Sequence, residues 1–328
     1  MRQIEFTPSG DRVGAIGFGA MGLSWVYDRH GLTERRKHEV LGLAVDLGMN
    51  VVDTAVLYGG GANEELVGAA LAPRRDEVFL CSKTGLRAAS LEPPRTERCG
   101  HPDEVRRSIE DSLRRLRTDA VDLYYLHRVD PDVPLEDTWG AMGELVTAGK
   151  VCHLGLSEVS TEQAERAHAI HPVAAVQSEY SLWTRNPEGS GPTADGDPSG
   201  DVIGWCAEHG AVFVPFSPLG RGYLSGALAG REFSGSDFRS RNPRFTPEAM
   251  AANEDAVLAP LREVAGRHGT SPAAVAIAWT TVRGEHVLPI PGTTDPGHLR
   301  EDAAAADLRL TAEDLTLLDG VAAVGDRY

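Results

Sequence analysis

Short apolar runs alternate along the chain with longer segments in which apolar positions recur every three or four residues. The runs are apolar at nearly every position, which is typical of strands buried on both faces of a parallel sheet, whereas the longer segments have the period of helices. The predicted strands are 14–18, 51–52, 78–82, 121–126, 151–156, 174–177, 212–216 and 287–290. The predicted helices are 33–46, 63–71, 102–116, 135–147, 161–169, 202–208, 257–268 and 297–306.

Eight strand–helix units predict an α/β fold of the closed (β/α)8, or TIM, barrel type, which needs about 250 residues. The chain has 328 residues. We assign the surplus to an N-terminal hairpin turning at 8–11, to extra C-terminal helices at 271–282 and 311–321, and to long loops. No linker separates the repeats, so residues 1–328 are expected to form one barrel domain.

Two loops are longer than a connection between neighbouring elements requires. They are 86–100, after the third strand, and 218–254, after the seventh. The segment 188–200 is rich in Gly, Ser, Pro and Asp, which predicts a mobile insertion. Ser160 and Thr311 have the sequence context of helix N-caps.

The charge balance narrows the possible functions. Lys and Arg number 32 against 48 Asp and Glu, a net charge of −16, which argues against nucleic acid as a partner. No apolar run of about 18 residues predicts a membrane span, and no apolar signal segment follows the N-terminus. The four cysteines are scattered, as expected of free thiols in a reducing compartment. We therefore expect a cytoplasmic protein.

One motif suggests a different fold. Gly17-Phe-Gly19-Ala-Met-Gly22 matches the G-x-G-x-x-G fingerprint of dinucleotide-binding sheets. That fingerprint requires a helix directly after it, yet the next predicted helix begins only near Thr33. We interpret these glycines as a tight turn at the mouth of a barrel.

Four polar residues fall at or just after three consecutive strand ends. Asp53, Lys83 and His127 end the second, third and fourth strands, and Tyr58 follows Asp53 by five positions. In a barrel these strand ends share one rim, where catalytic groups collect. An ammonium beside a phenol lowers its pKa, a carboxylate holds the ammonium, and a histidine orients a carbonyl. The set suits protonation of a carbonyl that receives a hydride, and no metal-ligand cluster competes.

Each residue also has a structural alternative. Asp53 could cap a loop, Tyr58 could pack at the rim, and His127 could be a core histidine bonded to the backbone. Lys83 decides between the two interpretations, because a lysine seldom ends a buried strand unpaired.

The motifs together resemble the aldo-keto reductase superfamily along essentially the whole chain. The order and spacing of the matching segments are specific to that superfamily. They are Asp53-Thr-Ala-x-x-Tyr58-Gly, Lys83, Asp122-Leu-Tyr-Tyr-Leu-His127, Gly155-Leu-Ser157, Gln177-Ser-Glu-Tyr180, Ser217-Pro-Leu-Gly-Arg-Gly222 and Ile290-Pro-Gly-Thr-Thr.

The resemblance implies reversible, NAD(P)H-dependent reduction of small-molecule aldehydes or ketones. Tyr58 would be the general acid, Lys83 and Asp53 would tune it, and His127 would position the carbonyl. Ser157 and Gln177 would bind the nicotinamide carboxamide, and Tyr180 would stack on the ring. The remaining cofactor contacts implied are Ser217, Leu219 and Gly222 along the pyrophosphate, and Thr293, His298, Glu301 and Asp302 at the adenosine end.

The chain departs from the family pattern in two places. Glu158 follows the carboxamide serine where many relatives have Asn, and Asp295 and His298 stand where Lys and Arg usually hold the 2′-phosphate. The loop arginines Arg239, Arg241 and Arg244 could compensate, or could be surface charges. We expect use of NADPH, with NADH also accepted.

Trp25, Tyr58 and His127 are expected to line the substrate pocket with the loops 86–100 and 218–254, although Trp25 could equally be a packing residue. The physiological substrate is not readable. A nicotinamide-sensing subunit with slow turnover is the alternative function, which the presence of all four catalytic-type residues disfavours. No exposed apolar stripe indicates an oligomeric state.

Overall fold

The computed structural model describes residues 1–6, 8–27, 32–91, 94–189, 199–228, 230–233, 235 and 237–325. Most of the predicted insertion 188–200 lies outside these residues. The predicted N-terminal hairpin is confirmed by the antiparallel strands β1 (Gln3–Phe6) and β2 (Asp11–Gly14). Phe6 of this hairpin packs against Phe79 and His153, which lie near the amino ends of their strands. The hairpin therefore covers the amino end of the barrel and leaves the opposite mouth for a site.

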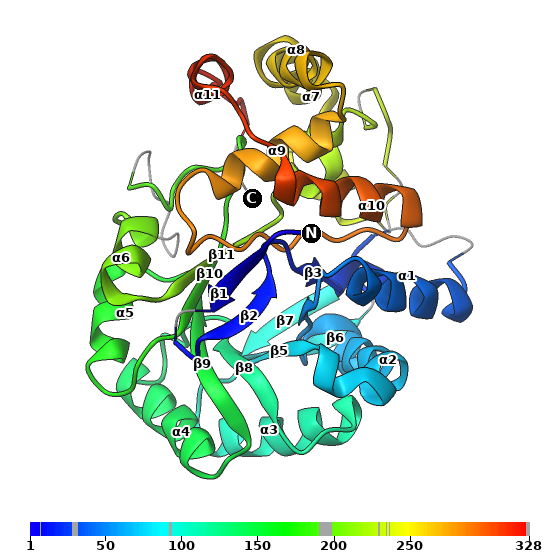
Figure 1. Ribbon diagram of the computed structural model, residues 1–328. Coiled ribbons are helices and arrows are strands. Elements are labelled where there is room, and N and C mark those ends of the chain that lie inside the picture. Colours follow the sequence, from blue (N-terminus) through cyan, green and yellow to red (C-terminus); the bar gives the residue numbers. More distant parts are fainter. Residues whose placement is uncertain are drawn as a thin grey trace.

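Seven parallel strands form a single curved sheet at the centre of the molecule (Figure 1). Their order is β11-β10-β9-β8-β5-β4-β3, so consecutive parallel strands are neighbours, as the βα repeat requires. All but one of the predicted strands appear within a few residues of their expected bounds. The strands are β3 (Phe18–Gly19), β4 (Val51–Asp53), β5 (Phe79–Thr84), β8 (Val121–Leu126), β9 (Val151–Ser157), β10 (Ala175–Glu179) and β11 (Val212–Phe216).

The eighth predicted strand, 287–290, closes the barrel without forming a regular strand. Pro289 and Pro291 have no N–H, so toward β3 this segment only accepts hydrogen bonds, from Gly17 and Gly19. We call the segment 286–291 the closing segment. Its backbone bonds to both neighbours are Phe213 N to His286 O (2.8 Å), Leu288 N to Phe213 O (2.9 Å), Ile290 N to Pro215 O (3.0 Å), Gly17 N to Pro289 O (2.9 Å) and Gly19 N to Pro291 O (2.9 Å).

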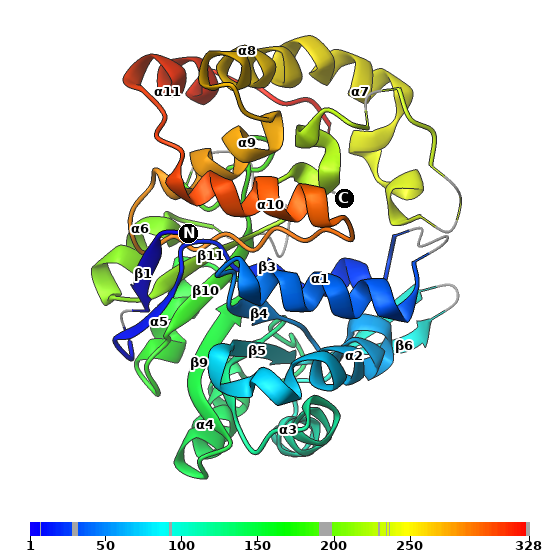
Figure 2. The ribbon, with the colours of Figure 1, turned by 45° about the vertical axis from the view of Figure 1, so that its right-hand side comes forward.

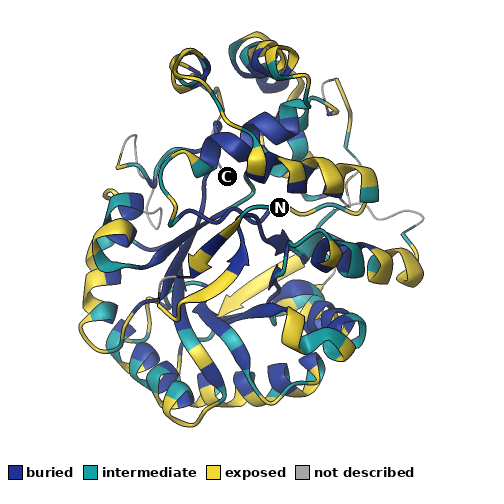
Figure 3. Ribbon diagram, in the orientation of Figure 1, coloured by how far each residue is buried: buried dark blue, intermediate teal, exposed yellow. Residues whose placement is uncertain are grey.

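Helices surround the sheet, and the buried residues gather in the strands and on the inner helix faces (Figures 2 and 3). Ser160 and Thr311 form the predicted N-caps, each in a reciprocal capping box. None of the helices in the described ranges has the length and apolar character that crossing a membrane requires. The helices around the sheet are α1 (Glu34–Asp46), α2 (Ala62–Leu71), α3 (Pro102–Leu116), α4 (Leu135–Thr147), α5 (Thr161–His168), α6 (Val202–His209), α9 (Pro272–Thr281) and α10 (Pro296–Ala304).

The structure corrects the assignment of the C-terminal helices. We expected 257–268 as the seventh barrel helix and 271–282 as an extra one. Instead α9 is buried from Ala273 to Thr280, because it is apolar all round. Three helices lie outside it: α7 (Pro247–Asn253), α8 (Ala259–His268) and α11 (Ala312–Asp319) (Figure 1).

The two long predicted loops contain structure of their own. The first holds an antiparallel hairpin of β6 (Leu86–Leu91) and β7 (Pro94–Arg98). The second begins with a 3-10 segment over Gly220–Ser225 and ends in α7. The backbone N–H of Phe238 donates to the carbonyl of Val26 (3.0 Å), so the second loop reaches the segment after β3.

Candidate active site

A buried lysine at the carboxyl end of β5 connects two other predicted catalytic residues, Asp53 at the end of β4 and Tyr58 in the segment after it. Lys83 has no exposed surface, and its Nζ donates to Asp53 Oδ1, to the Thr54 carbonyl (2.9 Å) and to the Tyr58 hydroxyl (3.2 Å). The other Asp53 oxygen accepts from Gln177 Nε2 (2.9 Å). Because all three ammonium protons are engaged, the lysine is held in one position.

The pKa of Tyr58 differs from the prediction. We expected the neighbouring ammonium to lower it, but burial raises the Tyr58 pKa by more than Lys83 lowers it, and Asp53 adds to the increase. The hydroxyl therefore stays protonated around neutral pH. Burial opposes the charge of Lys83, but Asp53 and Tyr58 outweigh it and raise the Lys83 pKa, so the lysine remains an ammonium.

His127 lies beside Tyr58 in an edge-on arrangement, with ring centroids 5.8 Å apart and planes at 88°. Burial holds its pKa well below the ordinary range, and the charges of Lys83 and Arg128 act in the same direction. The imidazole is therefore neutral at pH 7. Its Nδ1 is buried and has no hydrogen-bond partner among the described residues.

A small apolar cluster, separate from the main core, surrounds Tyr58. The Trp25 ring lies 5.9 Å from that of Tyr58, so the structure brings Trp25 to the predicted pocket. Sequence reasoning named Trp25, Tyr58 and the loop 86–100 here and missed Met21, Ala55 and Leu57. We call this the rim cluster: Met21, Trp25, Ala55, Leu57, Tyr58, Leu86 and Ala88.

Ser157 and Gln177, predicted to bind the carboxamide, face each other in the register of β9 and β10. Ser157 Oγ accepts a hydrogen bond from Arg128 Nη1 (3.1 Å). Glu158 instead accepts from the backbone N–H of Glu179 (2.7 Å), which gives it a structural role.

The prediction that Tyr180 stacks on the nicotinamide is wrong. Side chains alternate along a strand, so Tyr180 leaves β10 on the face opposite to Gln177. Its fully buried ring stacks on Trp279 of α9, with centroids 5.2 Å apart, and its hydroxyl donates to Glu188 (2.5 Å). A half-buried aromatic residue that does end a strand at the mouth is Phe216, the last residue of β11. Its place at a strand end is the signal that the sequence analysis missed.

The segment Ser217–Gly222 contains several residues in the left-handed region. Ser217 and Arg221 have φ angles of 51° and 57°, and Gly220 and Gly222 of 52° and 95°. The N–H groups of Gly220 and Gly222 donate to the carbonyls of Ser217 and Leu219 (both 2.9 Å), which holds the segment in a tight turn. Ser217, Leu219 and Gly222 are partly exposed, so this surface is open to a ligand.

At the predicted adenosine end, Asp295 is the N-cap of α10 and accepts from the backbone N–H groups of Gly297 (2.7 Å) and His298 (3.1 Å). These hydrogen bonds lower the pKa of Asp295, and the one from the N–H of His298 has the largest effect. Thr293 is partly exposed, and His298 and Glu301 are exposed, whereas Asp302 is buried on the inner face of the helix.

Two of the three loop arginines cannot compensate for the missing cations at the 2′ position. Arg244 is buried and bonds Glu179 (3.3 Å), and Arg239 pairs with Asp237 (2.7 Å). Both charges are therefore used within the protein, whereas Arg241 is exposed.

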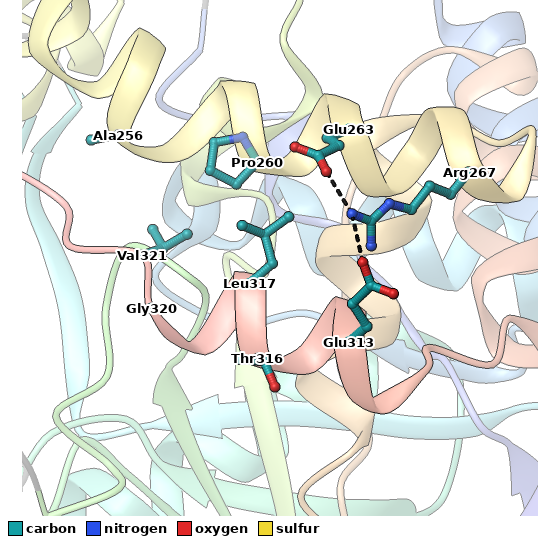
Figure 4. Close-up of a pocket in the computed structure, with 9 residues that line it drawn as sticks. All are labelled: Ala256, Pro260, Glu263, Arg267, Glu313, Thr316, Leu317, Gly320 and Val321. Carbon is teal, nitrogen blue, oxygen red and sulfur yellow. Dashed lines mark hydrogen bonds and ion pairs between the residues drawn. The ribbon is translucent and has the colours of Figure 1, made fainter.

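A surface groove of about 590 Å³ lies elsewhere, between α8 and α11 (Figure 4). Arg267 crosses it and pairs with Glu263 (2.5 Å) and Glu313 (3.1 Å). None of the predicted site residues lines it, and we assign it no role. In the described part of the chain, no group of three or more His, Cys, Asp or Glu side chains could hold a metal ion.

Comparison with known proteins agrees with this geometry. The sequence model of the aldo/keto reductase family matches residues 15–323. A probable aldo-keto reductase 1 of Glycine max is 36% identical over 327 residues, covering 99% of this chain and 90% of the relative. A glycerol dehydrogenase of Gluconobacter oxydans superposes with a TM-score of 0.86 at 27% identity, covering 97% of this chain and 94% of its own. An aldo-keto reductase of Klebsiella pneumoniae solved with NADPH superposes with a TM-score of 0.72 at 27% identity, covering 97% of this chain and 94% of its own.

Proposed function

Since this chain belongs to the aldo/keto reductase family, we propose that it reduces aldehydes or ketones to alcohols with NADPH, and that Tyr58 donates the proton. The observation that carries the proposal is the buried ammonium of Lys83, which joins the Asp53 carboxylate to the Tyr58 hydroxyl. Burying an ammonium costs free energy unless the charge is paired. Here Lys83 is paired with Asp53, and it also contacts the hydroxyl that would become negative.

Each of the four residues has its own role in the proposed reduction. When bound, the reduced nicotinamide supplies a hydride to the carbonyl carbon. Tyr58 gives its proton to the carbonyl oxygen, and Lys83 stabilises the tyrosinate that results. Asp53 keeps the lysine charged, and the neutral His127 orients the carbonyl oxygen through a ring N–H.

The described residues also fit the cofactor. Ser157 and Gln177 lie side by side for the carboxamide, and Phe216 replaces Tyr180 as the aromatic residue proposed to face the ring. The segment Ser217–Gly222 suits the pyrophosphate, because a barrel binds phosphate after its last strands. Thr293, His298 and Glu301 remain the proposed contacts of the adenosine end, whereas Asp302 is buried on the inner face of the helix and is no longer proposed as a contact. The Klebsiella pneumoniae relative, solved with NADPH, supports NADPH as the cofactor.

The test is turnover of a broad panel of aldehydes and ketones with NADPH and NADH, by wild type and by Tyr58→Phe. We expect measurable reduction by wild type and a loss of at least ~100-fold in the variant, with the cofactor Kd unchanged. Cofactor binding without turnover of any carbonyl would instead support the nicotinamide-sensing alternative, which a partner pull-down would then examine.

A further inference from the structure

Arg128 is a half-buried arginine at the barrel mouth whose charge is not neutralised by any carboxylate in the described ranges. Its Nη1 donates to the carbonyl of His127 (2.6 Å) and to Ser157 Oγ (3.1 Å). Its Nε and Nη2 bond to none of the residues described, and neither is sealed from solvent. The guanidinium is thus anchored by one nitrogen and offers the other two.

The charge of Arg128 acts directly on the reacting groups. After burial and Lys83, it is the next cause that lowers the His127 pKa, and it also opposes the effect of burial at Tyr58. Lys83 is paired with Asp53, and His127 is neutral. The Arg128 charge, which no carboxylate of the described residues pairs, therefore acts on the hydroxyl proposed to meet the carbonyl.

A second nitrogen in the same pocket lacks a partner. Trp25 Nε1 is buried and unpaired within the described ranges, and Trp25 is one of the partly buried members of the rim cluster. A simple alkyl aldehyde has one acceptor oxygen, which Tyr58 and His127 would occupy. It would leave the Trp25 N–H and the Arg128 guanidinium without an acceptor, which costs free energy once water is displaced. A substrate with a second, negatively charged acceptor would satisfy the Arg128 guanidinium.

We propose that Arg128 selects carbonyl substrates that carry a carboxylate close to the reacting carbonyl, and that it binds this carboxylate through Nε and Nη2. A guanidinium edge matches the two oxygens of a carboxylate in a bidentate pair. The carboxylate takes no part in the bond changes: the carbonyl carbon gains the hydride and its oxygen gains the Tyr58 proton. This inference rests on the proposed function, since it names the substrate class of that site.

The experiment compares acids with neutral aldehydes of the same shape. Glyoxylate is paired with 2-methylpropanal, and 4-oxobutanoate with 4-methylpentanal, because an isopropyl group has the outline of a carboxylate. The ratio of kcat/KM for each acid to that for its neutral partner is measured in wild type, Arg128→Lys and Arg128→Met. The exposed Arg309 provides the matched control, since Arg309→Met removes the same charge away from the mouth.

We expect wild type to prefer at least one acid, and Arg128→Met to lower that acid-to-neutral ratio by at least about 30-fold, the scale of a charged hydrogen bond. Arg128→Lys should keep part of the preference, and Arg309→Met all of it. Calorimetry of 4-hydroxybutanoate against 4-methylpentan-1-ol, with NADP⁺ bound, should show the same dependence on Arg128 in the product Kd.

An unchanged ratio in Arg128→Met, or a wild type that prefers both neutral aldehydes, would overturn the inference. If the Met variant does not fold, the salt dependence of wild type replaces it: KM for the preferred acid should rise with ionic strength, while that of its neutral partner stays constant. A constant KM for both would reject a charged contact. A wild type that reduces no carbonyl at all would overturn the proposed function itself, which is a separate result.

Discussion

Asp302 provides a quantitative test of the structure, because it is a carboxylate buried without a partner. Only 1% of the residue is exposed, and neither carboxylate oxygen has a hydrogen-bond partner within the described ranges. Burial, with a smaller contribution from Glu301, raises its pKa from 3.8 to about 7. The folded protein therefore holds a proton on this carboxyl at pH values where the unfolded chain has lost it.

The sign of the effect follows from proton linkage. Below pH 3.8 both states are protonated, and Asp302 costs nothing. Between 3.8 and about 7 only the unfolded chain ionises, so the free energy of unfolding falls by about 1.4 kcal/mol per pH unit. Above pH 7 both states are ionised, and the full loss is about 4 kcal/mol. A neutral side chain of the same shape avoids this loss.

Asp302→Asn should therefore be more stable than wild type at pH 8, by up to about 4 kcal/mol, with the advantage shrinking steadily toward pH 5. Urea denaturation of the cofactor-free protein at pH 5, 6, 7 and 8 measures the difference. Glu301→Gln is the matched control, since it removes the adjacent exposed charge and should change stability little. A stability difference that does not vary with pH would show that Asp302 is not a buried titrating group.

The other predictions concern the active site. Tyr58→Phe should lower the single-turnover rate of reduction at least ~100-fold at an unchanged cofactor Kd, and a near wild-type rate would exclude Tyr58 as the acid. Lys83→Met should lower kcat, alter the pH–rate profile and cost about 3 kcal/mol in urea, by leaving the Asp53 carboxylate unpaired; an unchanged profile in a stable variant would contradict the pairing. His298→Arg should tighten NADPH about 10-fold and leave NADH alone in fluorescence titrations, whereas equal shifts would remove His298 from the 2′ site. Tyr180→Leu, which removes the aromatic ring, should reduce thermal stability without changing the Kd for NADPH; a weaker Kd in a variant that still folds would return Tyr180 to the cofactor site.

The sequence predicts best those features that depend on repeated local patterns. The bounds of α3 and α4 are found exactly as expected, because the period of their apolar positions is clear. Asp53, Lys83 and His127 could be placed together because parallel strands bring their carboxyl ends to one rim. Topology alone therefore predicted the meeting of these residues.

The failures come from properties that need three-dimensional surroundings. Side chains alternate between the two faces of a strand, so whether an aromatic residue at a strand end points into the barrel depends on its exact position. Tyr180 points out of the barrel toward α9, and Phe216 lies at the mouth. The net pKa of Tyr58 depends on how far burial exceeds the effect of Lys83, and no sequence pattern gives that balance. The wrong assignment of the seventh barrel helix to α8 instead of α9 has the same origin. Two adjacent helical patterns in the sequence do not show which of the two packs on the sheet.

The closing segment has a consequence for how the protein is made. It joins residues roughly 270 positions apart, one of the longest loop closures this chain can form. Until 286–291 emerges during synthesis, β3 and β11 remain open edges with unpaired backbone groups, which can pair with other molecules. The closing segment therefore determines whether a nearly complete barrel closes on itself or pairs with other molecules and aggregates. Because Pro289 and Pro291 have no N–H, the closing segment can only accept hydrogen bonds on the β3 side, from Gly17 and Gly19.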